Sequence, residues 1–246
     1  MTDRPRVAVF RPGDERITDA VGLLDELAAD PVPDPMLEVD PTGAVPRIDA
    51  DYAVFTSKTG AELIADAGWT PGETAVCAIG DPTAAALTAA GYTVDLVPAE
   101  FSSAGLVDAL EGTCAGERVE IARSDHGSAV LLDGLTDAGA YVHETVLYRL
   151  GRPEQAGESA ELAAAGELDA ALFTSSLTVE HFLAAAADRG VRDDAIAGLA
   201  DAVVAVIGEP TAETARSHGV DVDIVPEQAD FEALARDAVA AASAER

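Results

Sequence analysis

Hydroxyl-bearing side chains stand directly after several apolar runs of this sequence, where they could bind an anion. At the carboxyl ends of parallel strands, helix N-termini present free backbone N–H groups and a partial positive charge. Two domains with such turns facing each other would form a cleft of hydroxyls and amides, which would suit a ligand with several carboxylates. The residues concerned are Thr56, Ser57, Thr83, Thr174, Ser175, Ser176 and Thr211, with Gly80 and Gly208 beginning two of the turns.

The alternative for each of these Ser and Thr residues is a plain helix N-cap, which is the commonest reason for the residue type at that position. The two roles are compatible, because a capped helix can still donate its remaining N–H groups. Their duplicated placement along the chain favours binding somewhat over capping alone.

Three cations stand at comparable places in a chain that otherwise avoids positive charge. Arg11 and Arg123 end two related apolar runs, and Lys58, the single lysine, follows a third. We expect them to pair with ligand carboxylates. A structural ion pair with a nearby acidic group is an equal alternative for Arg123 and a weaker one for Arg11 and Lys58.

Other kinds of chemistry lack their usual patterns here. The four histidines show no HxxxH spacing and no adjacent acidic ligand set, so we expect no metal. The sequence has no G-x-G-x-x-G or Walker A pattern and no assembled Ser/His/Asp set. We therefore expect no cofactor.

The elements that position the candidate residues come from one unit used twice. Residues 79–84 return as 207–212, and 94–98 return as 222–226 in the same register. The segment 53–57 is repeated at 171–175. The segment 6–11 is repeated, less clearly, at 118–123. Internal repetition of this kind indicates a duplicated architecture more strongly than any single motif does.

Each unit alternates short Val/Ile-rich runs with Ala- and Leu-rich stretches of helical spacing, which predicts βα units and parallel sheets. Helices are predicted to begin after Gly80 and Gly208 and to end near Gly91 and Gly219. Two connectors interrupt the alternation, at 31–46 and 148–157. The strand-like segments 36–39 and 145–148 at these connectors could pair as a hinge between domains.

The amino-acid composition limits the classes of function to be considered. Of 246 residues, 48% are hydrophobic, so a sizeable core can form, and the length favours two domains. A net charge of -30 disfavours nucleic acid and anionic membranes as partners. Because arginine is retained while lysine is nearly absent, we interpret the acidity as adaptation to a salt-rich cytosol and expect the fold to loosen on desalting.

Cys77 and Cys114 are the only cysteines, with no CxxC pair, so neither a disulfide framework nor a thiolate site is expected. The first residues are polar and charged, and no run of about 18 apolar residues appears. We expect a cytoplasmic protein.

The ordered set of motifs resembles the uroporphyrinogen-III synthase family and covers essentially the whole chain. The segments that carry the resemblance are 54–57, 79–83, 97–98, 146–149, 173–175 and 207–211. The resemblance implies an α/β fold with two doubly wound parallel-sheet domains joined by a two-stranded β-ladder. The first domain would combine residues 1–37 with 152–246, the second would span 41–147, and the ladder would use 36–41 and 145–151.

The resemblance also implies the reaction. The substrate would be hydroxymethylbilane, a linear tetrapyrrole with eight carboxylates, cyclised to uroporphyrinogen III with loss of water and inversion of ring D through a spiro-pyrrolenine. Tyr148 matches the family tyrosine after the second-connector strand and would donate a hydrogen bond to the departing hydroxyl. A packed hinge tyrosine is an equal alternative. The protein would be a monomer, open to transient contact with hydroxymethylbilane synthase.

One segment departs from the family pattern, because residues 124–128 lack the extra arginine usual after the Arg123 position. Two other classes of protein stay open. The first is a hinged two-domain α/β protein that binds a small polycarboxylate without chemistry. The second is a sugar-phosphate isomerase, which should carry a Gly/Ser-rich phosphate loop that is not found.

Overall fold

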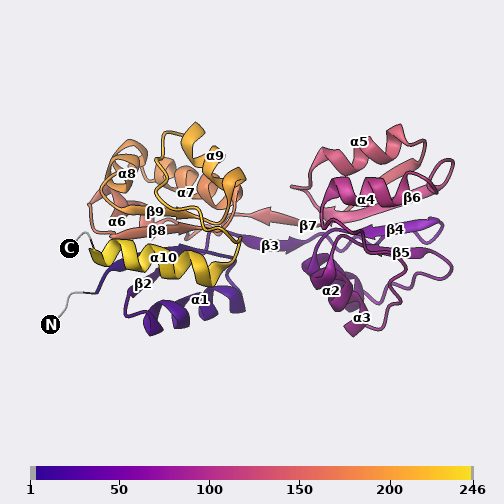
Figure 1. The fold of residues 1–246 in the computed structure, drawn as a ribbon, viewed down its shortest axis with the longest axis horizontal. Coiled ribbons are helices and arrows are strands. Elements are labelled where there is room, and N and C mark those ends of the chain that lie inside the picture. The colour runs from indigo at the N-terminus through magenta and orange to yellow at the C-terminus, as the bar shows by residue number, and fades with distance from the viewer. Residues whose placement is uncertain (1–3, 245–246) are drawn as a thin grey trace. The chain divides into compact units, whose positions relative to one another are not determined.

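A computed structural model describes residues 4–244 of the chain, which fold into two compact units. Unit 1 comprises Met1–Glu38 and Gly151–Arg246, and unit 2 comprises Val39–Leu150. The chain therefore crosses from one unit to the other twice. Figure 1 shows a sheet with helices on both faces in each unit. Within residues 4–244, no helix combines the length and the apolar character that crossing a membrane requires.

Unit 1 is built on a four-stranded parallel sheet in the order β2-β1-β8-β9. Helices α1 and α10 pack on one face, and the other face is covered by the remaining helices of the unit (Figure 1). The elements are β1 (Arg6–Phe10), α1 (Glu15–Glu26), β2 (Asp30–Pro33), α6 (Glu158–Ala164), β8 (Ala170–Phe173), α7 (Ser176–Asp188), α8 (Arg192–Leu199), β9 (Val203–Val206), α9 (Glu209–Ser217) and α10 (Phe231–Ala244).

The strands of unit 1 are buried on both faces because helices cover each side of the sheet. Val7 and Val9 point to the face under α1 and α10, whereas Ala8 and Phe10 point to the other. The alternation follows from the two-residue period of a strand. Such strands read as continuous apolar runs, which is the pattern that predicted a parallel sheet.

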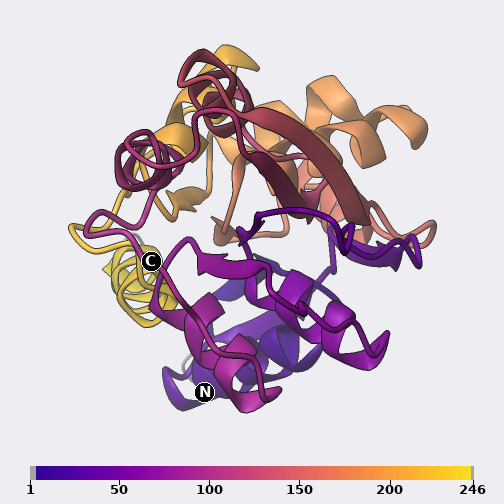
Figure 2. The same cartoon turned by 90° about the vertical axis from the view of Figure 1, so that its right-hand side faces the viewer.

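Unit 2 has a five-stranded sheet in the order β3-β7-β6-β4-β5, in which β4 to β7 pair in parallel. Helices α2 and α3 pack on one face and α4 and α5 on the other, as Figure 2 shows from the side of this unit. The elements are β3 (Glu38–Pro41), β4 (Tyr52–Phe55), α2 (Lys58–Asp66), β5 (Ala75–Ala78), α3 (Asp81–Ala89), α4 (Ser103–Leu110), β6 (Arg118–Ser124), α5 (Ala129–Asp137) and β7 (Tyr141–Gly151).

The two sheets repeat one topology with the chain order permuted. Strands β4 and β5 of unit 2 correspond to β8 and β9 of unit 1, and β6 and β7 correspond to β1 and β2. Each set makes the same neighbour pairs, and an isolated parallel bridge extends each sheet at the same place, Cys77 to Leu96 and Ala205 to Ile224. The predicted fold class, two doubly wound parallel-sheet domains related by duplication, is confirmed.

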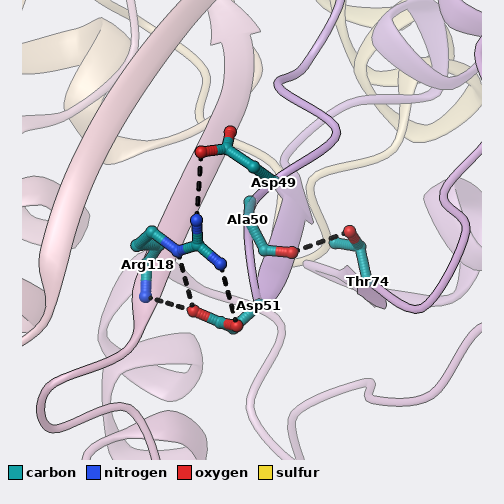
Figure 3. A network of polar contacts seen from close by, with 5 residues as sticks. All are labelled: Asp49, Ala50, Asp51, Thr74 and Arg118. Carbon is teal, nitrogen blue, oxygen red and sulfur yellow. Dashed lines mark hydrogen bonds and ion pairs between the residues drawn. The ribbon is translucent and has the colours of Figure 1, made fainter.

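A polar clamp ties the amino ends of the central strands of unit 2 (Figure 3). Asp51 accepts the backbone N–H of Arg118 at 2.8 Å, and the Arg118 guanidinium also lies 3.0 Å from Asp49. Thr74 donates its hydroxyl to the Ala50 carbonyl at 2.8 Å. The N–H of Arg118 first, and then its guanidinium, hold the pKa of Asp51 below its ordinary value of 3.8.

Unit 1 repeats the arginine and aspartate part of this clamp. Asp169 accepts the Arg6 N–H at 2.7 Å, and the Arg6 guanidinium pairs with Glu167 at 2.8 Å. Because the arrangement occurs at the corresponding strands of both units, we assign it to the fold and not to a site.

Strand β3 lies beside β7 at the edge of the unit 2 sheet. Next to it, the N–H of Thr42 donates to the Leu147 carbonyl at 2.9 Å, and its hydroxyl to the Val146 carbonyl at 2.7 Å. Strand β7 begins earlier than the predicted segment, because it pairs with β6 from Tyr141 to Tyr148.

Candidate functional site

The predicted site residues fall at the carboxyl ends of the parallel strands in each unit. In unit 2 these ends lead into the N-termini of α2 and α3, and in unit 1 into those of α7 and α9. The two sets are described separately.

Tyr148 and Ser57 form a hydroxyl pair in unit 2. Tyr148 is 6% exposed and its hydroxyl donates to Ser57 Oγ at 3.0 Å. Ser57 is the N-cap of α2 and accepts the Gly60 N–H at 2.9 Å. Because Ser57 Oγ accepts both of these hydrogen bonds, its own proton is free to be donated to a ligand. If Ser57 instead donates its proton to the Tyr148 oxygen, the Tyr148 proton is the one that is free.

A β-bulge aims Tyr148 at this position. Arg123 pairs with Val146, but Ser124 pairs with Tyr148, so Leu147 is the extra residue on β7. As a result Leu147 and Tyr148, which are consecutive, both pack into the core under α2 and α3. Bulges re-aim side chains in this way. The run of apolar residues carried no sign of the bulge, so sequence reasoning missed it.

Arg123 makes an ion pair within unit 2. Its side chain is 6% exposed, Nε donates to Glu144 Oε1 at 2.6 Å, and Nη1 donates to the Ser128 carbonyl. A Cβ at Gly127 would lie 2.5 Å from Arg123 Cδ, so the loop closes over the arginine only because this residue is glycine. The geometry matches the structural alternative for Arg123.

Arg11, the counterpart of Arg123 in unit 1, is in a different environment. Its guanidinium carbon lies 4.4 Å from the centroid of the Phe231 ring, and Nε is buried without a hydrogen-bond partner. Within residues 4–244 it makes no ion pair at 4 Å or less. Burial, and next the charge of Arg16, lower its pKa. An arginine stays charged regardless, so Arg11 is a cation available to a ligand.

The two glycine turns begin helices without side-chain caps. Gly80 and Gly208 have extended backbones, no side chain caps α3 or α9, and a proline follows in each first turn. The first-turn N–H groups that are left can receive an acceptor from a ligand. Thr83 and Thr211, by contrast, are only 3% and 4% exposed, so their hydroxyls belong to the interior.

The remaining predicted residues act locally. Ser175 caps α7 in a capping box with Thr178. Thr174 donates its hydroxyl to the Phe10 carbonyl at 2.7 Å, next to Arg11, and Ser176 donates to the Pro210 carbonyl at 3.1 Å. The N-cap alternative therefore holds for Ser57 and Ser175, although capping leaves other N–H groups free.

Thr56 and Lys58 flank Ser57 at the start of α2. Lys58 lies 3.4 Å from Glu62, one helical turn on, and both side chains are more than half exposed. Exposed pairs of this kind contribute little to stability, so Lys58 can exchange Glu62 for a ligand carboxylate.

A pocket of about 540 Å³ lies elsewhere in unit 2, at the amino ends of β6 and β7. Arg118 of the clamp lines it, together with Glu120 and His143, which are 2.9 Å apart. None of the predicted site residues lines this pocket. Among residues 4–244, no group of three or more His, Cys, Asp or Glu side chains could hold a metal ion.

Comparison with known proteins agrees with this fold. The family model described as uroporphyrinogen-III synthase HemD matches residues 18–236. A candidate uroporphyrinogen-III synthase from Methanothermobacter thermautotrophicus is 33% identical over 238 residues, covering 90% of this chain and 92% of the relative. The uroporphyrinogen-III synthase of Synechococcus elongatus is 29% identical over 175 residues, covering 68% and 66%.

A solved structure resembles the whole chain. The crystal structure of a mutant uroporphyrinogen III synthase from Thermus thermophilus superposes with a TM-score of 0.68 at 19% identity, covering 98% of this chain and 100% of the other. At that identity the likeness supports the fold alone, whereas the family model and the Methanothermobacter relative decide the membership. This chain belongs to the uroporphyrinogen-III synthase family.

Proposed function

We propose that the protein cyclises hydroxymethylbilane to uroporphyrinogen III, with inversion of ring D and release of water. Family membership supports the reaction class. The observation that carries the proposal is the hydroxyl pair of Tyr148 and Ser57, because it puts a proton donor of fixed geometry at the strand ends of unit 2. The proposed location is the cytoplasm, and the proposed state is a monomer.

The proton donor would act on the first bond to break. The C–O bond of the terminal hydroxymethyl group breaks, its electron pair stays on the oxygen, and the departing hydroxyl takes a proton from the Tyr148–Ser57 pair to become water. The cation that is left loses its pyrrole N–H proton to become the azafulvene, which restores one proton to the pair. The substituted carbon of ring D then attacks the azafulvene to give the spiro-pyrrolenine. Fragmentation and reclosure then give the inverted ring.

Positioning is the principal catalytic contribution in this proposal. Closure without inversion occurs spontaneously and gives the type I isomer, so the enzyme must hold the chain ends in the more demanding geometry. Arg11 and the uncapped starts of α3 and α9 are the proposed carboxylate contacts. They use guanidinium and backbone N–H groups, which an acidic protein can offer without raising its lysine content.

The experiment is a coupled assay in strong salt, in which hydroxymethylbilane is supplied and the oxidised type I and type III products are separated by chromatography. We expect mainly type III from the wild type. Arg11→Gln should raise KM more than it lowers kcat, and Arg123→Gln should act mainly through stability. Type I alone from a demonstrably folded sample would reject the synthase and favour the polycarboxylate-binding protein.

A further inference from the structure

Phe101 is unusual among the six phenylalanines of the chain, all of which lie in the described part. Four are completely buried, and Phe231 packs under Arg11. Phe101 alone is largely exposed, at 57%. The four buried residues are Phe10, Phe55, Phe173 and Phe182.

The ring of Phe101 lies against a predicted binding turn. A Cβ placed on Gly80 would be 3.0 Å from Phe101 Cγ and 3.1 Å from Phe101 Cβ. The phenylalanine therefore rests on the backbone just after β5, where a larger residue than glycine would press against the side chain. Much of the side chain stays open to solvent.

The loop that carries Phe101 is fixed by hydrogen bonds of Ser102 and by its close packing on α4, and not by burial of the ring. Ser102 donates its hydroxyl to the Glu100 carboxylate at 2.8 Å and caps α4 by accepting the Gly105 N–H at 3.0 Å. A Cβ on Gly105 would lie 2.1 Å from the Glu100 carbonyl oxygen, so the loop and the helix are in close contact. The aromatic side chain is thus held in place without contributing much to the core.

Unit 1 shows that the fold does not need this ring. In the repeat register of Pro98 and Pro226, Ala229 stands at the position of Phe101. A Cβ on Gly208 would meet only Pro210, at 3.9 Å. The following helix, α10, is still capped, because Asp230 accepts the Ala233 N–H at 3.0 Å as Ser102 does for α4.

We propose that Phe101 binds substrate by stacking a pyrrole ring of hydroxymethylbilane on its exposed face, an inference that rests on the proposed function. Stacking on an aromatic side chain is insensitive to charge. In a chain of net charge -30 acting on a substrate with eight carboxylates, such a contact adds affinity without adding repulsion. Strong salt screens ion pairs but leaves apolar contacts intact, so the stack keeps its strength where arginine contacts weaken.

The test compares variants that keep or remove the ring. Phe101→Leu should raise KM for hydroxymethylbilane about tenfold with a smaller change in kcat, whereas Phe101→Trp should keep KM near the wild-type value. Val97→Ala changes an exposed apolar residue of the same segment that has an equally exposed counterpart in Val225, and it should leave KM unchanged. Unfolding midpoints should be nearly the same for all of these variants, because Phe101 and Val97 are both exposed.

A binding measurement complements the kinetics. In Phe101→Trp, uroporphyrinogen III added without oxygen should quench the introduced indole, whereas butanetetracarboxylate, which has no ring, should not. The native Trp69 is only 5% exposed and gives the background. A Phe101→Leu variant with wild-type KM, or an indole that uroporphyrinogen III does not quench, would overturn the stacking role. Failure of the proposed function would instead appear as a wild-type enzyme that yields type I alone.

Discussion

Removing the two hydroxyls of the Tyr148–Ser57 pair separately and together distinguishes a catalytic tyrosine from a packed one. Tyr148→Phe keeps the ring in the core beside Leu147 and deletes one neutral hydrogen bond of 3.0 Å. That bond should contribute about 1 kcal/mol to the free energy of unfolding. Ser57→Ala deletes the same bond and also the N-cap of α2, which adds about 1 kcal/mol.

The double variant loses the shared bond only once. Its unfolding free energy should therefore fall by about 2 kcal/mol and not 3, a coupling of about 1 kcal/mol between the two sites. Denaturant unfolding in strong salt measures all four proteins. A coupling near zero would mean that the 3.0 Å contact is not formed in solution.

Activity decides between the two roles. If the pair protonates the departing hydroxyl, Tyr148→Phe should lower kcat for type III formation roughly 100-fold or more while stability falls little. Ser57→Ala should have a smaller effect, because Tyr148 can then donate directly. A Tyr148→Phe enzyme with wild-type kcat and isomer ratio would refute the proton-donor role and leave Tyr148 as a structural residue.

Further predictions concern stability and reactivity. Asp34, 4% exposed, accepts the backbone N–H groups of Gly157 and Ser159 at 2.9 Å, so Asp34→Ala should cost roughly 3 kcal/mol in denaturant unfolding, and a loss below about 1 kcal/mol would contradict this. Because the pKa of Asp51 lies below its ordinary 3.8, its stabilisation is present above that pH and lost as the pH falls through the lowered value. In strong salt the unfolding midpoint should therefore drop on acidification, and less so in Asp51→Asn. Burial raises the pKa of Cys77 to about 12, so a thiol reagent at about pH 8 should label it only after unfolding. Stepwise desalting should lower the unfolding midpoint if the charge of -30 is adapted to salt, whereas a constant midpoint would reject that interpretation.

The fold was predictable because the internal repeat and the spacing of the apolar residues both predict βα units. The apolar runs at 53–57 and 171–175 gave the central strands, and Gly80 and Gly208 marked the helix starts that the structure contains. The partners of individual side chains were harder to predict from the sequence. The bulge at Leu147 and the closing of the loop over Arg123 depend on contacts between β6 and β7, which no local pattern reveals.

The duplication also separates what the fold requires from what one unit adds. The clamp at the amino ends of the strands occurs in both units and is therefore structural. Arg11 and Arg123 occupy the same position, but their neighbours differ. In unit 2 the strand residue beside Ile121 is Glu144, which neutralises Arg123, whereas in unit 1 the residue beside Val9 is Pro33, which offers no charge.

A partly buried arginine without a carboxylate partner carries a desolvation cost that a purely structural position would not retain. Unit 1 stabilises its arginine through the face of Phe231 and through the charges of Asp14, Asp19 and Asp230, none of which forms an ion pair with it at 4 Å or less within residues 4–244. The same comparison singles out Phe101, whose counterpart is Ala229. Each unit thus departs from the shared plan at its carboxyl strand ends. Among the described residues, unit 1 has an arginine without an ion pair, and unit 2 has an exposed aromatic ring and a hydroxyl pair.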